Sequence, residues 1–250
     1  MNFFNLSKII FIFLLSSFSV YAQKLNIALC IMATGKYINY AEQLVKSAKK
    51  YFLKNHNITY LIFTDSNKTN KKNKIYIFQK RLGWPYDTMN RFHSYDDSKK
   101  ILQQFDYIYA TDADMLFVSN VGDEILGDLV GVRHPGFINS NRRSYSYEVN
   151  SNSLACIKND EGEFYFAGGF YGAKKENFLN LISQCRKNVD EDLKKGIIAV
   201  WHDESHLNRY FIDHKPNVIL SPSYCYPENW KMPYEKKLLA LDKNHSEMRK

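Results

Sequence analysis

Near the middle of the chain stands the stretch Asp106-Tyr-Ile-Tyr-Ala-Thr-Asp-Ala-Asp-Met-Leu-Phe-Val118. Its apolar, β-branched and aromatic residues predict a buried strand that ends in two carboxylates, Asp112 and Asp114. Ligands of open α/β sheets bind beyond the carboxyl ends of the strands. Two acids this close repel each other unless a cation lies between them, and hard oxygen ligands suit Mg²⁺ or Mn²⁺. For an isolated Asp-x-Asp, a solvated acidic turn is the alternative, so the rest of the sequence has to decide.

Around this stretch, apolar runs alternate with helical patterns. Runs at 25–33, 58–64, 75–78 and 129–133 predict strands, and a helix is expected over 87–105 with Asp87 as its cap. Residues 163–172 predict a strand interrupted by glycines, 174–196 an amphipathic helix, and Trp201 the start of another. The basic sequence from Lys231 onward predicts weak structure. This order predicts an α/β fold with a mostly parallel sheet, whose first half suits nucleotide binding.

Composition excludes some classes of protein. The 250 residues carry a net charge of +8, with 15% aromatic residues, which excludes a disordered chain. The lysines are scattered, and the sequence has no basic helix, zinc spacing or aromatic-basic RNA motif, so we expect no nucleic-acid binding. A basic surface also attracts an anionic sugar nucleotide or a membrane. The four cysteines show no close pair or metal-ligand spacing and are expected to be free thiols.

The N-terminus resembles an export signal. Lys8 precedes an apolar run over residues 9–21, and Ala22 is the small residue expected before a cleavage site. The run is shorter than the ~20 residues that span a bilayer comfortably. A cleaved signal peptide is therefore the first hypothesis and a short membrane anchor the second. Both predict an exported or membrane-associated protein whose folded part begins near Gln23.

A second acidic pair lies in Trp201-His-Asp-Glu-Ser-His-Leu-Asn-Arg-Tyr210, at the predicted start of a helix. Asp203 and Glu204 suit that position, because the first turn stabilises anions. His202 and His206 have a helical i, i+4 spacing, but with no third ligand they are interpreted as hydrogen-bond partners. An indole beside carboxylates is typical of sugar sites, where a ring stacks on the pyranose and acids bind its hydroxyls. For the other two indoles, Trp84 and Trp230, the alternative to sugar binding is a place in the hydrophobic core.

This string, together with His134-Pro-Gly-Phe137 and Asp160-Glu-Gly-Glu-Phe-Tyr-Phe-Ala-Gly-Gly-Phe-Tyr-Gly172, resembles glycosyltransferase family 6, the family of the histo-blood-group A and B transferases. The resemblance extends from about Leu25 to the end of the chain. It implies a GT-A fold and a retaining transfer of Gal or GalNAc from a UDP-sugar to the 3-hydroxyl of an acceptor galactose. Residues 23–250 would then form one catalytic domain, with a UDP-binding half (23–118), an acceptor and catalytic half (119–230) and a flexible C-terminal flap (231–250).

The resemblance also implies roles for individual residues on the donor side. Asp112 and Asp114 match the Asp-x-Asp that holds Mn²⁺ against the UDP diphosphate; because both acids are present, metal dependence is expected. Residues that match contacts to the uridine, the sugar or the diphosphate are Ala33, Thr34, Tyr37, Arg91, Ala167, Gly168, Gly169, Asp203, Lys243 and Arg249. Thr34 replaces a larger apolar residue of the family, which weakens the expected uracil contact.

On the reacting side, Glu204 matches the glutamate that acts as a nucleophile or stabilises an oxocarbenium-like state, and the sequence leaves both open. His134 and Trp201 match acceptor contacts. The family's acidic acceptor contact has no aligned equivalent unless Glu228 serves, so the acceptor is predicted only as a terminal β-galactoside, with or without fucose. Ala167 and Gly169 match the positions that separate GalNAc from Gal use, and their small size favours UDP-GalNAc.

Two other functions compete with this hypothesis. A catalytically idle module that binds a sugar or a nucleotide could keep the same fold, although the retained acids argue against it. A nucleotidyltransferase also places acidic pairs on an α/β sheet, but it would release pyrophosphate rather than UDP. Turnover to UDP separates all three functions.

Overall fold

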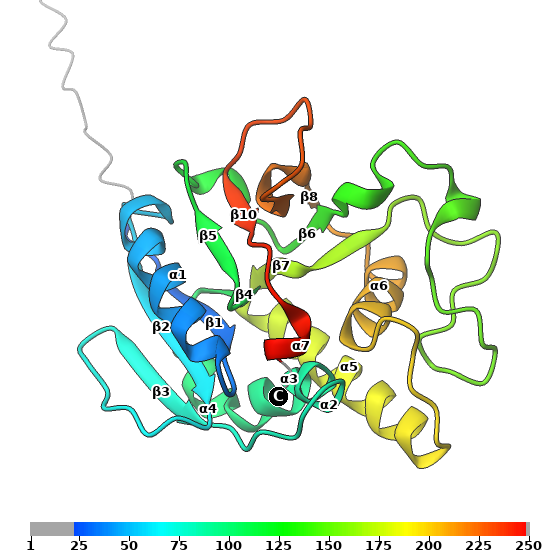
Figure 1. The fold of residues 1–250 in the computed structure, drawn as a ribbon, viewed down its shortest axis with the longest axis horizontal. Coiled ribbons are helices and arrows are strands. Elements are labelled where there is room, and N and C mark those ends of the chain that lie inside the picture. Colours follow the sequence, from blue (N-terminus) through cyan, green and yellow to red (C-terminus); the bar gives the residue numbers. More distant parts are fainter. Residues whose placement is uncertain (1–22, 249–250) are drawn as a thin grey trace, which may run out of the picture.

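The computed structural model describes residues 23–248; the predicted signal or anchor segment over residues 1–22 and Arg249 lie outside the described residues. The apolar runs form a seven-stranded sheet, and a three-stranded sheet lies beside it (Figure 1). The principal elements are β1 (Asn26–Met32), α1 (Tyr37–Tyr51), β2 (Asn57–Thr64), β3 (Lys74–Phe78), α2 (Tyr86–Met89), α3 (Arg91–Asp97), α4 (Lys99–Leu102), β4 (Tyr107–Asp112), β5 (Met115–Phe117), β6 (Leu129–Arg133), β7 (Phe166–Lys174), α5 (Lys175–Lys194), α6 (Asp203–Asp213), β8 (Val218–Leu220), β9 (Tyr226–Pro227), β10 (Leu238–Ala240) and α7 (His245–Met248).

The large sheet has the strand order β3-β2-β1-β4-β7-β6-β8. Strands β3, β2, β1 and β4 run parallel, and β6 runs parallel to β8. Strand β7 is antiparallel to both of its neighbours, β4 and β6. The prediction of an α/β fold with a mostly parallel sheet is therefore confirmed in its coarse form, with β7 as the exception.

Both faces of this sheet are buried, which explains the continuous apolar runs. On one face, Leu29 and Ile31 of β1 pack with α1 and the small sheet. On the other face, Ala28 and Cys30 pack with the core residues of α3, α5 and α6. Because neighbouring residues of a strand point to opposite faces, each central strand contributes to two cores.

The strand predicted to end in the Asp112 and Asp114 carboxylates is confirmed as β4, and the rest of the quoted stretch belongs to the small sheet. Strand β4 ends at Asp112, and β5 begins at Met115 and pairs antiparallel with β10, where Met115 lies opposite Ala240. The chain leaves the large sheet between these strands, so Asp112 and Asp114 flank the point where it changes direction. Strand β5 was not predicted, because its pairing partner β10 lies more than a hundred residues further along the chain.

The predicted helix over 87–105 is also wrong in its continuity. It is divided into α2, α3 and α4, with the chain turning at Asn90 and Ser98, where ψ is −3° and 14°. Met89 and Phe92 are buried as expected. Asp87 lies inside α2 rather than at its cap, and its carboxylate accepts a hydrogen bond from the Leu82 N–H at 2.7 Å.

Three further expectations have an outcome. All four cysteines are free thiols, as predicted. Trp84 and Trp230 are half exposed, so the alternative that they belong to the core is wrong. The segment from Lys231 onward, predicted to be weakly structured, contains β10 and α7. Within residues 23–248, no helix has the length and apolar character that crossing a membrane requires.

Candidate active site

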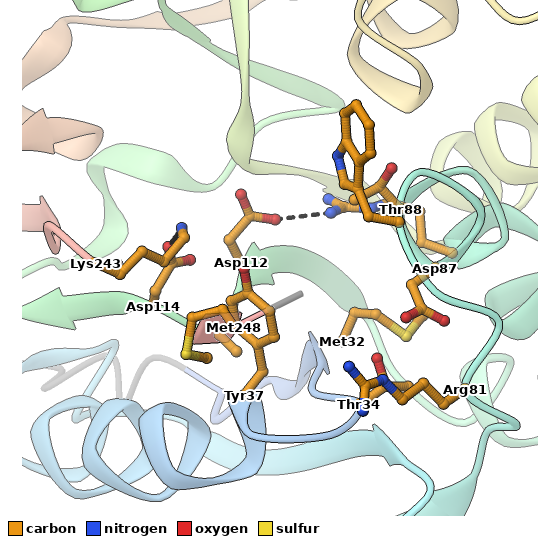
Figure 2. A pocket seen from close by; sticks show the side chains of 13 residues that line it. Met32, Thr34, Tyr37, Arg81, Asp87, Thr88, Asp112, Asp114, Lys243 and Met248 are labelled. Carbon is orange, nitrogen blue, oxygen red and sulfur yellow. Dashed lines mark hydrogen bonds and ion pairs between the residues drawn. The ribbon is translucent and has the colours of Figure 1, made fainter. Parts of the chain in front are cut away.

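A pocket opens at the carboxyl ends of β1 and β4, where the parallel strands of an α/β sheet present their ligand-binding edge. Figure 2 shows that it is bounded by Lys243 and Asp114 on one side and by Arg81 and Asp87 on the other. The lining comes from four segments that are far apart in the sequence: the end of β1, the stretch from β3 to the start of α3, the turn after β4, and the C-terminal residues. The lining residues are Met32, Thr34, Tyr37, Arg81, Trp84, Asp87, Thr88, Arg91, Asp112, Ala113, Asp114, Lys243 and Met248.

The two predicted metal ligands lie in this pocket. Asp114 is only 6% exposed, and one of its carboxylate oxygens is ion-paired with the Lys243 ammonium. The Leu241 N–H donates to the Asp114 carbonyl at 2.9 Å, which fixes the C-terminal segment beside the acid. A buried carboxylate requires a partner of opposite charge, and Lys243 supplies it here.

Arg91 joins the two acidic pairs of the sequence, because it contacts Asp112 of one and Asp203 of the other. Its guanidinium is buried and lies 2.8 Å from Asp112 Oδ1 and 3.0 Å from Asp203 Oδ2, and it donates to the Gly168 carbonyl at 3.4 Å. Burial raises the pKa of Asp203 to about 6, an effect that Arg91 opposes and Asp112 reinforces. The arginine thus stabilises two carboxylates that would otherwise repel each other.

Glu204 is held by one donor on each oxygen. The Gly168 N–H donates to Oε2 at 2.7 Å, and the Tyr165 hydroxyl donates to Oε1 at 2.9 Å. Burial raises the pKa of Glu204 to about 7, although these two hydrogen bonds lower it. A carboxylate fixed at the start of α6, with a pKa near neutrality, suits nucleophilic or electrostatic catalysis.

The residues present fit a divalent cation that arrives with a diphosphate. Asp112 and Asp114 offer hard oxygen ligands at the pocket, and the Lys243 ammonium beside Asp114 shows that this position accepts positive charge. Among the described residues, no group of three or more His, Cys, Asp or Glu side chains could hold a metal ion. The remaining ligands would therefore come from the donor and from water. Mg²⁺ binding is typically of this kind, through one or two carboxylates plus substrate phosphates.

The predicted uridine contacts lie at the end of β1. Thr34 and Tyr37 line the pocket, whereas Ala33 is fully buried, with its N–H bonded to the Phe63 carbonyl at 2.8 Å. Ala33 therefore supports the pocket wall from within the core. Lys243 also lies over the Tyr37 ring, with 5.6 Å between Nζ and the ring centroid.

Ala167 and Gly169 lie on the face of β7 that packs against Cys225, and a Cβ atom at Gly168 would lie on the opposite face. A Cβ atom at Gly169 would lie 3.3 Å from Cys225 Sγ and 3.7 Å from both Met115 Sδ and Asp112 Oδ2. A Cβ atom at Gly168 would lie 3.3 Å from Glu204 Oε2. The missing Cβ atoms therefore give room beside Cys225 at Gly169 and beside Glu204 at Gly168.

The predicted acceptor residues lie beyond Glu204. The His134 ring is 5.5 Å from the Tyr165 ring, and its Nδ1 accepts a hydrogen bond from the Gly136 N–H at 3.0 Å. Trp201 is half exposed, as an aromatic platform for a sugar would be. Glu228, considered as an acceptor contact, instead accepts a hydrogen bond from the Asp242 N–H at 3.0 Å, at the base of the C-terminal segment.

The two histidines of the Trp201 motif separate. His202 has φ of 53° and lies edge-on to Trp84, with 5.1 Å between the rings. His206 is buried, with Nε2 3.8 Å from Asp192 Oδ2. They do not share a ligand site, which agrees with their interpretation as polar partners rather than metal ligands.

Several residues of this site were not predicted from the sequence. Arg81, Asp87 and Thr88 line the pocket because they follow β3, the third parallel strand, and the same strand-end rule that identified Asp112 would have indicated them. Tyr165 had no such signal, because its contact with Glu204 spans 39 residues of sequence.

Comparison of the amino-acid sequence with known proteins identifies a family and several relatives. The model of glycosyltransferase family 6 matches residues 13–250. Histo-blood group ABO system transferase 1 of Rattus norvegicus is 35% identical over 241 residues, covering 91% of this chain and 69% of the rat protein. Globoside alpha-1,3-N-acetylgalactosaminyltransferase 1 of Gallus gallus is 32% identical over 238 residues, covering 90% and 69%. The O-antigen biosynthesis glycosyltransferase WbnI of Escherichia coli is 30% identical over 217 residues, covering 85% and 92%.

Proposed function

This chain belongs to glycosyltransferase family 6, and on that premise we propose that it transfers GalNAc, with Gal as the alternative, from a UDP-sugar to the 3-hydroxyl of a terminal β-galactoside. Membership itself makes it a glycosyltransferase of a retaining α-1,3 family, with a nucleotide-sugar donor and a glycan acceptor. The specific donor, the acceptor and the residue roles are the proposal.

One observation carries the proposal: Arg91 links the donor pocket to the reacting carboxylate. Its guanidinium contacts Asp112 at the pocket and the carbonyl of Gly168, whose own N–H holds Glu204. An idle binding module would need the pocket but not a carboxylate held this way. The continuous cluster therefore favours catalysis over binding alone.

The proposed roles follow from position. Thr34 and Tyr37 would contact the uridine, with Ala33 behind them, and Asp112 and Asp114 would hold Mn²⁺ or Mg²⁺ against the diphosphate. The metal would neutralise charge that develops on the departing UDP. Lys243 lies where its ammonium can bind the same phosphates. Arg249 is proposed to share this role on the family resemblance alone.

The sugar would lie between Asp112 and Glu204. Arg91 and Asp203, with Ala167, Gly168 and Gly169, are the residues proposed around it. Glu204 in its ionised form would face the anomeric carbon, as a nucleophile or as a charge that stabilises an oxocarbenium-like state. His134 and Trp201 would place the acceptor galactose on the far side.

UDP-GalNAc is the proposed donor because Ala167 and Gly169 are small. The space in front of Gly169 is bounded by the sulfur atoms of Cys225 and Met115. These polarisable side chains can adjust to an N-acetyl group more readily than a backbone wall could. The acceptor is left as a terminal β-galactoside, fucosylated or not.

The deciding experiment follows UDP release from UDP-GalNAc and UDP-Gal, with Mn²⁺ or with EDTA, in the presence and absence of β-galactosides. We expect metal-dependent release that is faster with UDP-GalNAc and is increased by one acceptor. Turnover without metal would remove the role proposed for Asp112 and Asp114. UDP binding with no turnover under any condition would favour the idle module.

A further inference from the structure

The positive charge of this protein is concentrated in one part of the chain. Residues 24–81 contain twelve Lys and Arg residues and only two acids, Glu42 and Asp65. This segment therefore has a net charge of +10. Because the whole chain has a net charge of +8, the charges of the remaining residues sum to −2. Both acids are engaged, because Glu42 accepts hydrogen bonds from Lys74 at 2.5 Å and Tyr76 at 2.7 Å, and Asp65 accepts one from the Gly35 N–H at 2.7 Å.

Six of these side chains lie at the end of the sheet opposite the pocket. Strands β1, β2 and β3 are parallel and begin at the same edge, as the pairs Asn26–Asn57 and Tyr60–Lys74 show. Lysines precede each strand there, and the last turn of α1 ends at the same edge because α1 leads from the carboxyl end of β1 to the start of β2 (Figure 1). The six lysines, all exposed, are Lys24, Lys49, Lys50, Lys54, Lys71 and Lys72. We call this set the basic edge.

Two acids, Asp106 and Asp123, lie near the basic edge, and its six lysines outnumber them three to one. The Asp106 carboxylate accepts a hydrogen bond from the Asn26 N–H at 2.7 Å, and Asp123 contacts His56 Nε2 at 3.0 Å. Within residues 23–248, none of the six lysines forms an ion pair with a carboxylate. Lys50 Nζ lies 4.8 Å from the centroid of the Tyr51 ring, a contact that leaves its charge in place, so the edge can attract an external anion.

The chain enters the fold at this same edge. The apolar run over residues 9–21 precedes Lys24 by only two residues in sequence, and Leu25 is bonded to Asn57 and His56. A single apolar segment binds membranes weakly, and an adjacent polybasic surface supplies the second signal that stable attachment needs. Each lysine near an anionic lipid surface adds about 1 kcal/mol to binding.

We propose that the basic edge rests on the anionic phospholipid headgroups of a membrane, with the donor pocket turned toward the aqueous phase. All six charges are lysines, which act as point charges on phosphates. Single-stranded nucleic acid sites combine a basic groove with exposed stacking aromatics. The Tyr51 ring beside Lys50 is only partly exposed, which favours a lipid surface over a nucleic acid. A soluble UDP-sugar would then reach a pocket at the edge of the sheet that faces away from the lipid.

The test uses the full-length chain and vesicle flotation. We expect binding to vesicles that contain phosphatidylglycerol to exceed binding to pure phosphatidylcholine by roughly tenfold or more at low salt and to fall at high salt. The variant Lys49→Gln/Lys50→Gln/Lys54→Gln should lose most of this difference. The matched control Lys187→Gln/Lys194→Gln/Lys195→Gln removes the same charge from the C-terminal end of α5 and the residue after it, and should retain the difference.

Equal, salt-independent binding to both kinds of vesicle would assign attachment to the apolar segment alone and overturn the proposal. The proposal would also be overturned if the same lysines bound an oligonucleotide and the protein showed no preference for anionic vesicles. Both triple variants should release UDP at the wild-type rate with a soluble acceptor, because the basic edge is remote from the pocket. Failure of membrane binding is thereby distinguishable from failure of the proposed reaction.

Discussion

The Tyr165 hydroxyl donates a hydrogen bond to Glu204 Oε1 at 2.9 Å, and this contact connects the ring cluster around His134 to the Glu204 carboxylate. Tyr165 is 3% exposed and packs against the rings of His134, Phe137 and Tyr147. The aromatic cluster fixes the hydroxyl, and the hydroxyl in turn fixes the carboxylate. Tyr165 is therefore a positioning residue for Glu204.

Replacement of Tyr165 by Phe should lower kcat by about 10- to 100-fold with little change in KM for the donor. Hydrogen bonds to charged groups contribute about 1.5–3 kcal/mol, and the ring itself remains in the cluster. Since this hydrogen bond lowers the pKa of Glu204, its loss should also move the acid limb of the pH–kcat profile to higher pH.

Tyr147→Phe is the matched control for this prediction. Tyr147 stacks on Tyr165, and its hydroxyl donates to the Phe164 carbonyl at 2.6 Å, not to Glu204. This variant should lower stability but leave the pH–kcat profile in place. Equal effects of the two substitutions on kcat and on the acid limb would assign Tyr165 a purely structural role.

The pKa of Glu204 predicts how the rate depends on pH. Burial raises this pKa to about 7, and the proposed chemistry uses the ionised carboxylate. The rate constant should therefore fall as the pH decreases below about 7, and Glu204→Gln should lose at least roughly 100-fold in kcat at every pH. The Gln variant should still bind UDP by calorimetry. A rate that is unchanged from pH 8 to pH 5 would show that Glu204 titrates outside this range or does not act as an anion.

Lys243 and the metal are predicted to compete for Asp114. The ammonium is ion-paired with the carboxylate that would bind the cation. Lys243→Gln should therefore bind Mn²⁺ more tightly than the wild type in the absence of UDP, by about tenfold, and bind UDP less tightly. Electron paramagnetic resonance of free Mn²⁺ measures the first effect and calorimetry the second.

Lys237→Gln provides the comparison for this experiment. Lys237 lies in the same C-terminal segment and is paired with Glu124 at 2.8 Å, away from the pocket. The Lys237→Gln substitution removes the same charge and should alter neither the affinity for Mn²⁺ nor the affinity for UDP. If Lys243→Gln bound Mn²⁺ more weakly than the wild type, the ammonium would be a support for the metal site rather than its competitor.

Donor choice should respond to Gly169 and not to Gly168. In Gly169→Ala, the methyl group would contact Cys225 Sγ at 3.3 Å on the face that carries Ala167, so use of UDP-GalNAc should fall several-fold relative to UDP-Gal. In Gly168→Ala, the methyl group would contact Glu204, so both donors should be used more slowly, with their ratio unchanged. The ratio of kcat/KM for the two donors measures each effect. An unchanged ratio in Gly169→Ala would remove the argument for GalNAc.

The sequence predicted the parts of this structure that depend on local pattern. Strands β1 to β4 were located within about two residues because their sequences are continuous apolar runs, which in β1, β2 and β4 reflects burial on both faces of the sheet. Asp112, Asp114 and Glu204 were found because each follows or begins such an element. Strands β5 and β10 were not found, because three residues carry too little pattern and form a strand only by pairing with segments far away in the sequence.

The contacts that complete the site depend on tertiary structure instead. Arg91 was assigned by family resemblance, but its simultaneous contact with Asp112 and Asp203 requires α3, β4 and α6 to meet. Tyr165 has the sequence context of an ordinary core tyrosine. No periodicity distinguishes a hydroxyl that reaches a carboxylate from one that does not, and only the packed structure reveals the difference.

Buried His206 predicts a loss of stability in acid. Its ring is 2% exposed, and burial lowers its pKa to about 4, although Asp192 and Glu148 act in the opposite direction. In the unfolded chain the pKa is about 6.5. Between these values the unfolded state binds more protons than the folded state, so the free energy of unfolding should fall as the pH decreases from about 6.5 to about 4.

His206→Gln tests this assignment because glutamine keeps a polar side chain but does not titrate. Urea unfolding at pH 7 and at pH 4.5 should show the wild type losing roughly 1–3 kcal/mol more than the variant over this interval. His134→Gln is the companion, because burial lowers the pKa of His134 to about 4 as well, and the two effects should add. If both variants lost as much stability as the wild type, the acid sensitivity would have to come from the carboxylates.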